Sequence, residues 1–134
     1  TEDDNTLDCL SQAGIEYVAD WVLDDQPVWL QAKPKPVLSV PYTVEINDIP
    51  MMLLQQHRSE ELLLRGIDQF ERLWLESEKI PRVMSISVHP YITGVPHRIG
   101  YFEKLLDHIQ SRAGVVIQTG EQISNWYREQ VPFK

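Results

Sequence analysis

The chain has 134 residues, a length that suits one ordinary domain. Its 43% hydrophobic and 24% charged residues are typical of a globular chain that forms a core. The net charge of −8 argues against a nucleic-acid backbone as the main partner, because such binding needs a basic patch. The stretch Lys33-Pro-Lys35-Pro is the only basic cluster, and it is too short to form such a patch.

The single cysteine, Cys9, excludes an internal disulfide and a cysteine metal cluster. This is compatible with a reducing compartment, so we expect a cytoplasmic location. No apolar run approaches the roughly 18–20 residues of a membrane span, and no membrane partner is expected. The sequence shows no signal-peptide pattern and starts at Thr1 rather than Met, so we expect that a preceding part has been removed by processing or truncation.

Short β-rich runs alternate with amphipathic helices along the chain. In the first part, Asn5 is placed to cap a short helix that Gly14 ends. Strands are expected at 15–22 and 37–40, on either side of a polar, Pro-rich loop, and 41–50 is expected to be irregular. The remaining signals are a helix capped by Ser59, a strand at 82–88, a helix from Pro96, a strand at 115–118, and a Thr119–Gln122 capping box for a last helix. This order predicts a parallel sheet covered by helices, either open or as about half of a β/α barrel.

The segment 84–94 carries the most informative chemical pattern. Strand alternation places its large apolar residues on one face and Ser85, Ser87 and His89 on the other. His89 comes last, at the C-terminal end of the strand, where parallel α/β folds place catalytic groups. Pro90 restrains His89 to an extended backbone. The pattern fits either a positioned acid or base, or a structural histidine at a strand end.

A second candidate site follows the first expected strand. Asp20, Asp24 and Asp25 lie within six residues, where carboxylates can orient a histidine, bind a cation or raise one another's pKa. A solvated turn, with an aspartate accepting from loop amides, explains them equally well. Trp21 is a candidate for the wall of a pocket or for the core.

Two further polar groups favour structural interpretations. For Glu45, Asn47 and Asp48 we favour loop capping over a role in a site. The histidines His97 and His108 are expected at the surface. Together with His57 they lack ligand spacing, so no complete metal site is expected within this chain.

Three strings in this sequence resemble the polysaccharide-deacetylase (NodB-homology) superfamily. They are YVADWVLDDQP at 17–27, VPYTVEINDIP at 40–50 and SVHPYITGVPHRIGYFEKLLDHI at 87–109. The resemblance is greatest to the branch of metal-independent allantoinases and related intracellular deacetylases, and it covers essentially the whole chain. It implies the C-terminal half of a deformed (β/α) TIM-like barrel, with parallel strands covered by helices.

The resemblance also implies a chemistry. Family members hydrolyse carbon–nitrogen bonds, in N-acetylated sugars or in small cyclic amides. His89 matches the histidine of the fifth family motif, a general acid to the leaving nitrogen, and Tyr91 beside it is a candidate substrate contact. Asp20-Trp21 with Asp24 and Asp25 matches the region of the fourth motif, although in a different register.

The first three family motifs, which supply the base, the metal ligands and an arginine, have no counterpart in residues 1–134. We therefore expect a partial catalytic domain that is inactive alone and has a sugar or small-molecule amide as substrate. The intact enzyme is expected to form a tetramer, and the resemblance leaves a divalent metal such as zinc open for it.

The apolar segment Ile49-Pro-Met-Met-Leu-Leu54 is compatible with a contact between subunits and also with a short buried helix. A non-catalytic binding or assembly module on a degenerate barrel is the alternative function.

Overall fold

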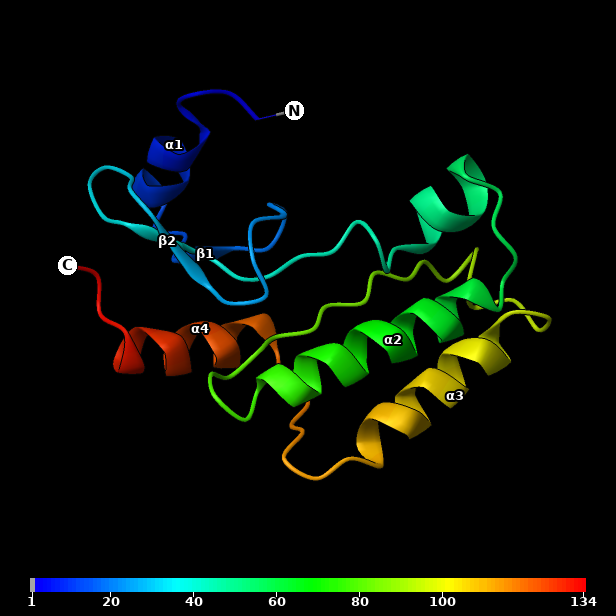
Figure 1. Ribbon diagram of the computed structural model, residues 1–134. Helices are drawn as coiled ribbons and strands as arrows, with labels where there is room; N and C mark the ends of the chain where they lie inside the picture. Colours follow the sequence, from blue (N-terminus) through cyan, green and yellow to red (C-terminus); the bar gives the residue numbers. More distant parts are fainter. Residues whose placement is uncertain (1) are drawn as a thin grey trace. The chain divides into compact units, whose positions relative to one another are not determined.

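The computed structural model describes residues 2–134, and they form two compact units. Unit 1 comprises the described residues of Thr1–Tyr42 together with Ile117–Lys134, and unit 2 is Thr43–Val116. The elements (Figure 1) are α1 (Thr6–Gln12), β1 (Tyr17–Val18), β2 (Val28–Leu30), β3 (Val37–Ser39), the π-helical η1 (Ile49–Leu54), α2 (Glu61–Glu76), α3 (Ile99–Gln110) and α4 (Gly120–Gln130).

A three-stranded sheet of order β1-β3-β2 organises unit 1. The strands β1 and β3 are parallel, with Tyr17 opposite Leu38, whereas β2 and β3 are antiparallel. The sheet is therefore mixed, and the expectation of an all-parallel sheet is wrong here, because the Pro-rich loop contains β2 and returns antiparallel to β3. The buried residues Val18, Ala32 and Val37 pack with leucines of α1 and β2.

The ends of three helices test the capping predictions. Thr119 and Gln122 form the expected capping box, in which the Thr119 hydroxyl accepts from the Gln122 backbone N–H and the Gln122 side chain accepts from the Thr119 N–H. Gly14 follows α1 with a φ of +82°, as a left-handed helix stop requires. Asn5 occupies the expected N-cap position of α1, although its side chain makes no capping hydrogen bond. The N-cap of α2 is Glu60 rather than Ser59, so that prediction is wrong.

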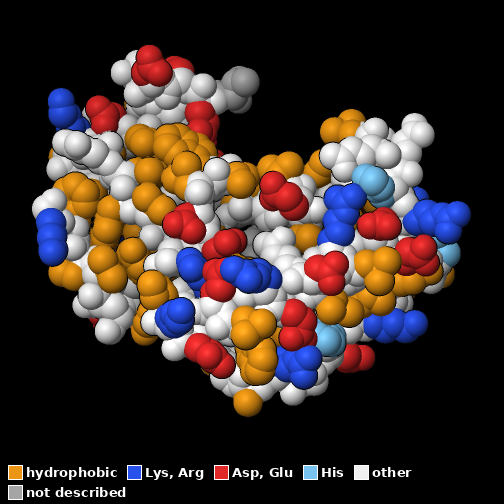
Figure 2. Space-filling model, viewed as in Figure 1, with side chains coloured by type: hydrophobic (Ala, Val, Ile, Leu, Met, Phe, Trp, Pro, Cys, Tyr) orange, Lys and Arg blue, Asp and Glu red, His pale blue; other side chains and the backbone are white. Residues whose placement is uncertain are grey.

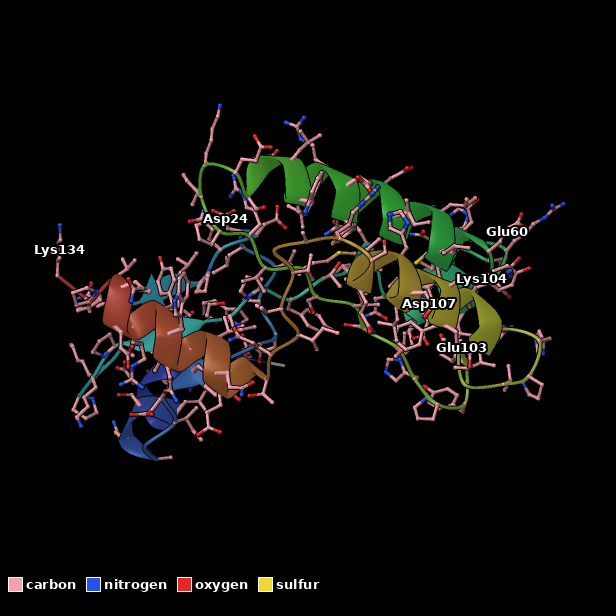
Figure 3. All side chains as sticks on the ribbon, turned by 90° about the horizontal axis from the view of Figure 1, so that it is seen from below. Asp24, Glu60, Glu103, Lys104, Asp107 and Lys134 are labelled. Carbon is pink, nitrogen blue, oxygen red and sulfur yellow. The ribbon has the colours of Figure 1, made fainter. Side chains whose placement is uncertain are left out.

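Unit 2 is built on the packing of α2 against α3, which lie side by side in Figures 1 and 3. Phe70, Leu105 and Ile109 form the buried cluster between them. Charged residues Glu103, Lys104 and Asp107, labelled on α3 in Figure 3, are exposed. Each helix thus has a buried apolar stripe, as its periodicity predicts.

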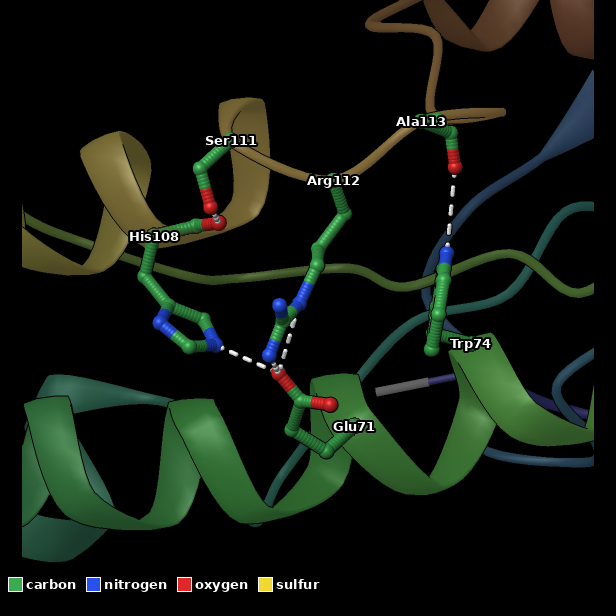
Figure 4. Close-up of polar contacts among 6 residues, drawn as sticks. All are labelled: Glu71, Trp74, His108, Ser111, Arg112 and Ala113. Atoms are coloured by element: carbon green, nitrogen blue, oxygen red, sulfur yellow. Dashed lines mark hydrogen bonds and ion pairs between the residues drawn. The ribbon is translucent and has the colours of Figure 1, made fainter.

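A polar cluster links Glu71 of α2 to the C-terminal part of α3 and to Arg112, which follows that helix (Figure 4). One oxygen of Glu71 accepts from the Arg112 guanidinium at 2.6 Å and lies 2.7 Å from His108 Nε2. The hydrogen bond from Arg112, and to a smaller extent that from His108, holds the pKa of Glu71 below its usual value. The Arg112 guanidinium also lies over the ring of Trp74, which donates to the Ala113 carbonyl. His108 is therefore a partner of α2 and not the simple surface residue expected from the sequence.

Three expected strands are shorter than predicted or absent. The run 15–22 has strand pairing only at Tyr17–Val18, and 115–118 lies outside the described strands. The segment 82–88 is likewise no strand and makes a single parallel bridge, between Ser87 and Asn47. An apolar β-branched run favours an extended backbone, but a strand also needs a neighbour for its N–H and C=O groups. Within residues 2–134 these runs have few such neighbours.

Acidic and basic side chains stand beside one another on the face shown in Figure 2, without a basic stripe. No helix among the described residues is long and apolar enough to cross a membrane.

The close approach of α2 and α3 generates a stability prediction. A methyl group added at Gly66 in α2 would lie 2.4 Å from a terminal carbon of the fully buried Leu105. We expect Gly66→Ala to lower the free energy of unfolding of the whole protein by about 1–3 kcal/mol, because an overpacked core must shift.

Gly100→Ala in α3 is the matched control, since its added methyl group meets nothing within 4 Å. Alanine has the higher helix propensity, so this change should be neutral or stabilising by up to about 1 kcal/mol. Urea unfolding followed by circular dichroism measures both variants. Equal effects of the two substitutions would contradict a tight α2–α3 contact.

Candidate active site

The main chain of unit 2 brings two segments far apart in sequence into one short parallel pairing. The Ser87 N–H donates to the Ile46 carbonyl at 3.0 Å, and the Asp48 N–H donates to the Ser87 carbonyl at 3.1 Å. This pairing places Asp48 beside His89 at the end of the bridge. The position after the paired residues is where parallel α/β folds present functional side chains.

Asp48 is fully buried, and both of its carboxylate oxygens are engaged. Oδ2 accepts from the His89 backbone N–H at 2.7 Å and from the Thr93 hydroxyl at 2.6 Å, while Oδ1 lies 2.6 Å from His89 Nδ1. Burial raises the pKa of Asp48, but the hydrogen bonds from Thr93 and from the backbone and ring of His89 outweigh it and lower the pKa below its usual value. The carboxylate is therefore ionised at neutral pH.

An ionised carboxylate can only accept hydrogen bonds, so His89 Nδ1 carries a hydrogen toward Asp48. Nε2 is the ring nitrogen that is left for a substrate. The His89 side chain is 35% exposed, which allows such an approach. A half-exposed imidazole whose other nitrogen is bound to a buried carboxylate has the geometry of a proton-transfer group.

Tyr91 lies next to His89 and is 67% exposed. The two rings meet edge to face, with their centroids 5.7 Å apart. An exposed aromatic ring of this size offers a flat apolar surface beside the imidazole.

A tight turn carries His89 and Tyr91. The N–H groups of Ile92 and Thr93 both donate to the His89 carbonyl at 2.9 Å, and this folds Thr93 back onto Asp48. A Cβ at Gly94 would lie 2.4 Å from the Pro90 carbonyl oxygen, so the turn closes only with glycine there.

The remaining sequence candidates lie in unit 1. Asp20 and Asp24 are exposed, and Trp21 is half-buried with its indole N–H donating to Glu2. The Asp25 N–H donates to the Asp24 carboxylate at 2.7 Å, which is the loop contact expected of a structural turn. Their contribution to a site stays a prediction.

Sequence reasoning missed Asp48 and Thr93 as parts of this arrangement. Asp48 was interpreted as a loop cap, yet it receives His89 and Thr93 in the interior. One signal was available: an aspartate flanked by Ile46 and Ile49 is placed among residues that become buried. Thr93 gave no such signal, since its hydroxyl meets Asp48 only through the folded turn.

The relatives of known name are deacetylases. A protein of Schizosaccharomyces pombe named as a polysaccharide deacetylase is 35% identical over 129 residues, covering 88% of this chain and 40% of its own length. The peptidoglycan deacetylase of Helicobacter pylori is 29% identical over 120 residues, covering 90% of this chain and 35% of its own length. No protein-family model matches the chain.

Two crystal structures have the same fold over nearly the whole chain. A polysaccharide-deacetylase-type protein of Pseudomonas aeruginosa PAO1 has a TM-score of 0.86 at 29% identity, covering 94% of this chain and 43% of its own. An allantoinase has a TM-score of 0.90 at 25% identity, covering 99% and 45%. These findings confirm the similarity of the chain to the polysaccharide-deacetylase superfamily. The chain spans less than half the length of each of these proteins.

The lowered pKa of Asp48 generates a prediction on stability. A group with a lowered folded-state pKa stabilises the fold above its unfolded-state value, here 3.8, and this contribution is lost as the pH falls through the lower folded-state pKa. We expect Asp48→Asn to cost about 1.5–3 kcal/mol of unfolding free energy at pH 7, the range for hydrogen bonds to a charged group. The cost should shrink below pH 3.8.

Urea unfolding of the wild-type protein and the variant at several pH values from 7 to 3 measures this difference. Glu103→Gln, which changes an exposed carboxylate on α3, is the control and should cost little at every pH. A cost for Asp48→Asn that stays constant down to pH 3 would show that the charge of Asp48 does not stabilise the fold.

Proposed function

We propose that the whole protein is a hydrolase of non-peptide carbon–nitrogen bonds and that this chain supplies its proton-transfer residue. The main support for this proposal is the hydrogen bond between the buried, ionised Asp48 and Nδ1 of the half-exposed His89. The names of the relatives, polysaccharide and peptidoglycan deacetylase and allantoinase, support the same reaction class.

In this proposal, water attacks the amide carbonyl and forms a tetrahedral intermediate, and a base from another part of the protein takes one proton from that water. The carbon–nitrogen bond then breaks, and its electron pair goes to the nitrogen. His89 gives its Nε2 proton to this nitrogen, so that a neutral amine leaves. Asp48 stays ionised, fixes the direction of the ring through Nδ1 and stabilises the imidazolium before transfer.

The substrate is either an N-acetylated carbohydrate or a small cyclic amide. Tyr91, exposed beside the His89 ring, supports stacking against a sugar or a planar ring. We also propose Trp21 as a residue that contacts the substrate. Asp20, Asp24 and Asp25 are proposed as the carboxylates that support catalysis from the fourth-motif region.

We further propose that residues 1–134 form the C-terminal half of a deformed (β/α) barrel, with the first three motifs supplied by another part of the protein. The coverage of the relatives, all below one half, supports this division. The residues described here do not fit a divalent metal by themselves, because no group of three His, Cys, Asp or Glu side chains among residues 2–134 could hold one. A complete set of zinc ligands for the intact enzyme would therefore include residues from another part of the protein. We propose that the 134 residues alone lack activity.

Self-association and location complete the proposal. The segment η1 buries Met51 and Met52, as a short buried helix would, but exposes Leu53 and Leu54. We propose that Leu53 and Leu54 take part in a subunit contact of a tetramer.

The single cysteine, Cys9, is exposed and supports a reducing, cytoplasmic location.

The acid role of His89 is tested by His89→Ala in the full-length protein. We expect kcat to fall by about 100-fold or more on an N-acetylated oligosaccharide or a cyclic amide, because a positioned general acid is lost. Substrates with a better leaving group should lose less, since protonation of the nitrogen then matters less. Steady-state kinetics with a series of amides measures both effects.

His97→Ala is the control, because His97 is an exposed residue of the same segment. It should change turnover little. Near-normal turnover of His89→Ala would leave His89 with a structural role only and would favour a non-catalytic module. Unfolding of that variant would also contradict the acid role.

A further inference from the structure

Thr93 is the one side-chain donor to Asp48, among residues 2–134, that does not belong to His89 itself. Its side chain is buried, at 1% exposure for the residue, and its hydroxyl lies 2.6 Å from Asp48 Oδ2. An ionised carboxylate has no proton to give, so the hydroxyl must donate. The Thr93 hydroxyl therefore donates its hydrogen bond to Asp48.

The two carboxylate oxygens of Asp48 accept hydrogen bonds from different groups. Oδ2 receives two donors, the Thr93 hydroxyl and the His89 N–H, and Oδ1 is directed to the His89 ring. Without the Thr93 donor, Oδ2 would keep one partner in a site that water does not reach. The carboxylate would then be held on Oδ2 by the His89 N–H alone, so its direction would be less restrained.

We propose that Thr93 is a positioning residue that holds Asp48 in the one orientation in which His89 keeps its proton on Nδ1 and presents Nε2 to the substrate. The Thr93 hydroxyl donates to the Asp48 carboxylate, so in this proposal it acts on the His89 ring through Asp48. The turn from His89 to Gly94 sets its place, since the Thr93 N–H donates to the His89 carbonyl at 2.9 Å. The inference rests on the proposed function for its kinetic consequence but not for its structural one.

The test compares Thr93→Val, which removes the hydroxyl at nearly constant shape, with Thr93→Ser, which keeps it. The ring-nitrogen shifts of His89 in the full-length protein, labelled with ¹⁵N-histidine, report which nitrogen carries the proton in the neutral ring. A His89→Gln sample identifies the His89 signals. The wild-type protein and Thr93→Ser should show the Nδ1–H form, and Thr93→Val should show a mixture with the Nε2–H form.

The variants that lose the Nδ1–H form of His89 should also have a lower kcat. We expect Thr93→Val to lower kcat about 10-fold with KM nearly unchanged, and Thr93→Ser to stay within about 3-fold of the wild-type protein. If Thr93→Val fails to fold by circular dichroism, Thr93→Ala serves as the second variant without a hydroxyl.

An unchanged Nδ1–H form in every folded variant without the hydroxyl would overturn the inference, whatever the activity. A tautomer shift in Thr93→Val that Thr93→Ser does not share would support it even in a protein that hydrolyses no amide. That second result would separate a failure of the proposed function from a failure of the positioning role.

Discussion

The candidate site depends on the hydrogen bonds made by one fully buried carboxylate, that of Asp48. Asp48 is ionised in the interior, where an unpaired charge is strongly unfavourable. It is tolerated because three donors from the segment 89–93 surround it: the backbone and ring of His89 and the hydroxyl of Thr93. The same contacts that stabilise the charge also fix the direction of the imidazole.

The fold of unit 2 serves this arrangement at two levels. The bridge between Asn47 and Ser87 sets the register that brings Asp48 to His89, and the turn closed at Gly94 brings Thr93 to the same carboxylate. Ile46, Met51 and Ile92 are buried in one cluster with Leu62 of α2, so core residues lie close to the site residues along both segments. Rigid support of this kind is what a positioned proton donor requires.

The sequence predicted the features whose causes are local. Helices α2, α3 and α4 follow from apolar periodicity, and the Thr119–Gln122 capping box follows from four neighbouring residues. His89 was found because a strand-like run ends at it. The strands at 82–88 and 115–118 failed because a strand depends on a neighbour that local sequence does not specify. Asp48 and Thr93 were missed for the same reason: Asp48 meets His89 across 41 positions of the chain, and its burial exists only after that pairing.

The central claim is that Asp48 contributes to catalysis by acting on His89, and a double-mutant cycle on kcat of the full-length protein tests it most directly. Asp48→Asn, His89→Gln and the double variant are compared with the wild-type protein on one amide substrate. Because Asp48 acts through His89, the double variant should be no slower than His89→Gln alone, within about 3-fold. If the two losses instead multiplied in the double variant, Asp48 and His89 would act independently and the account would be contradicted.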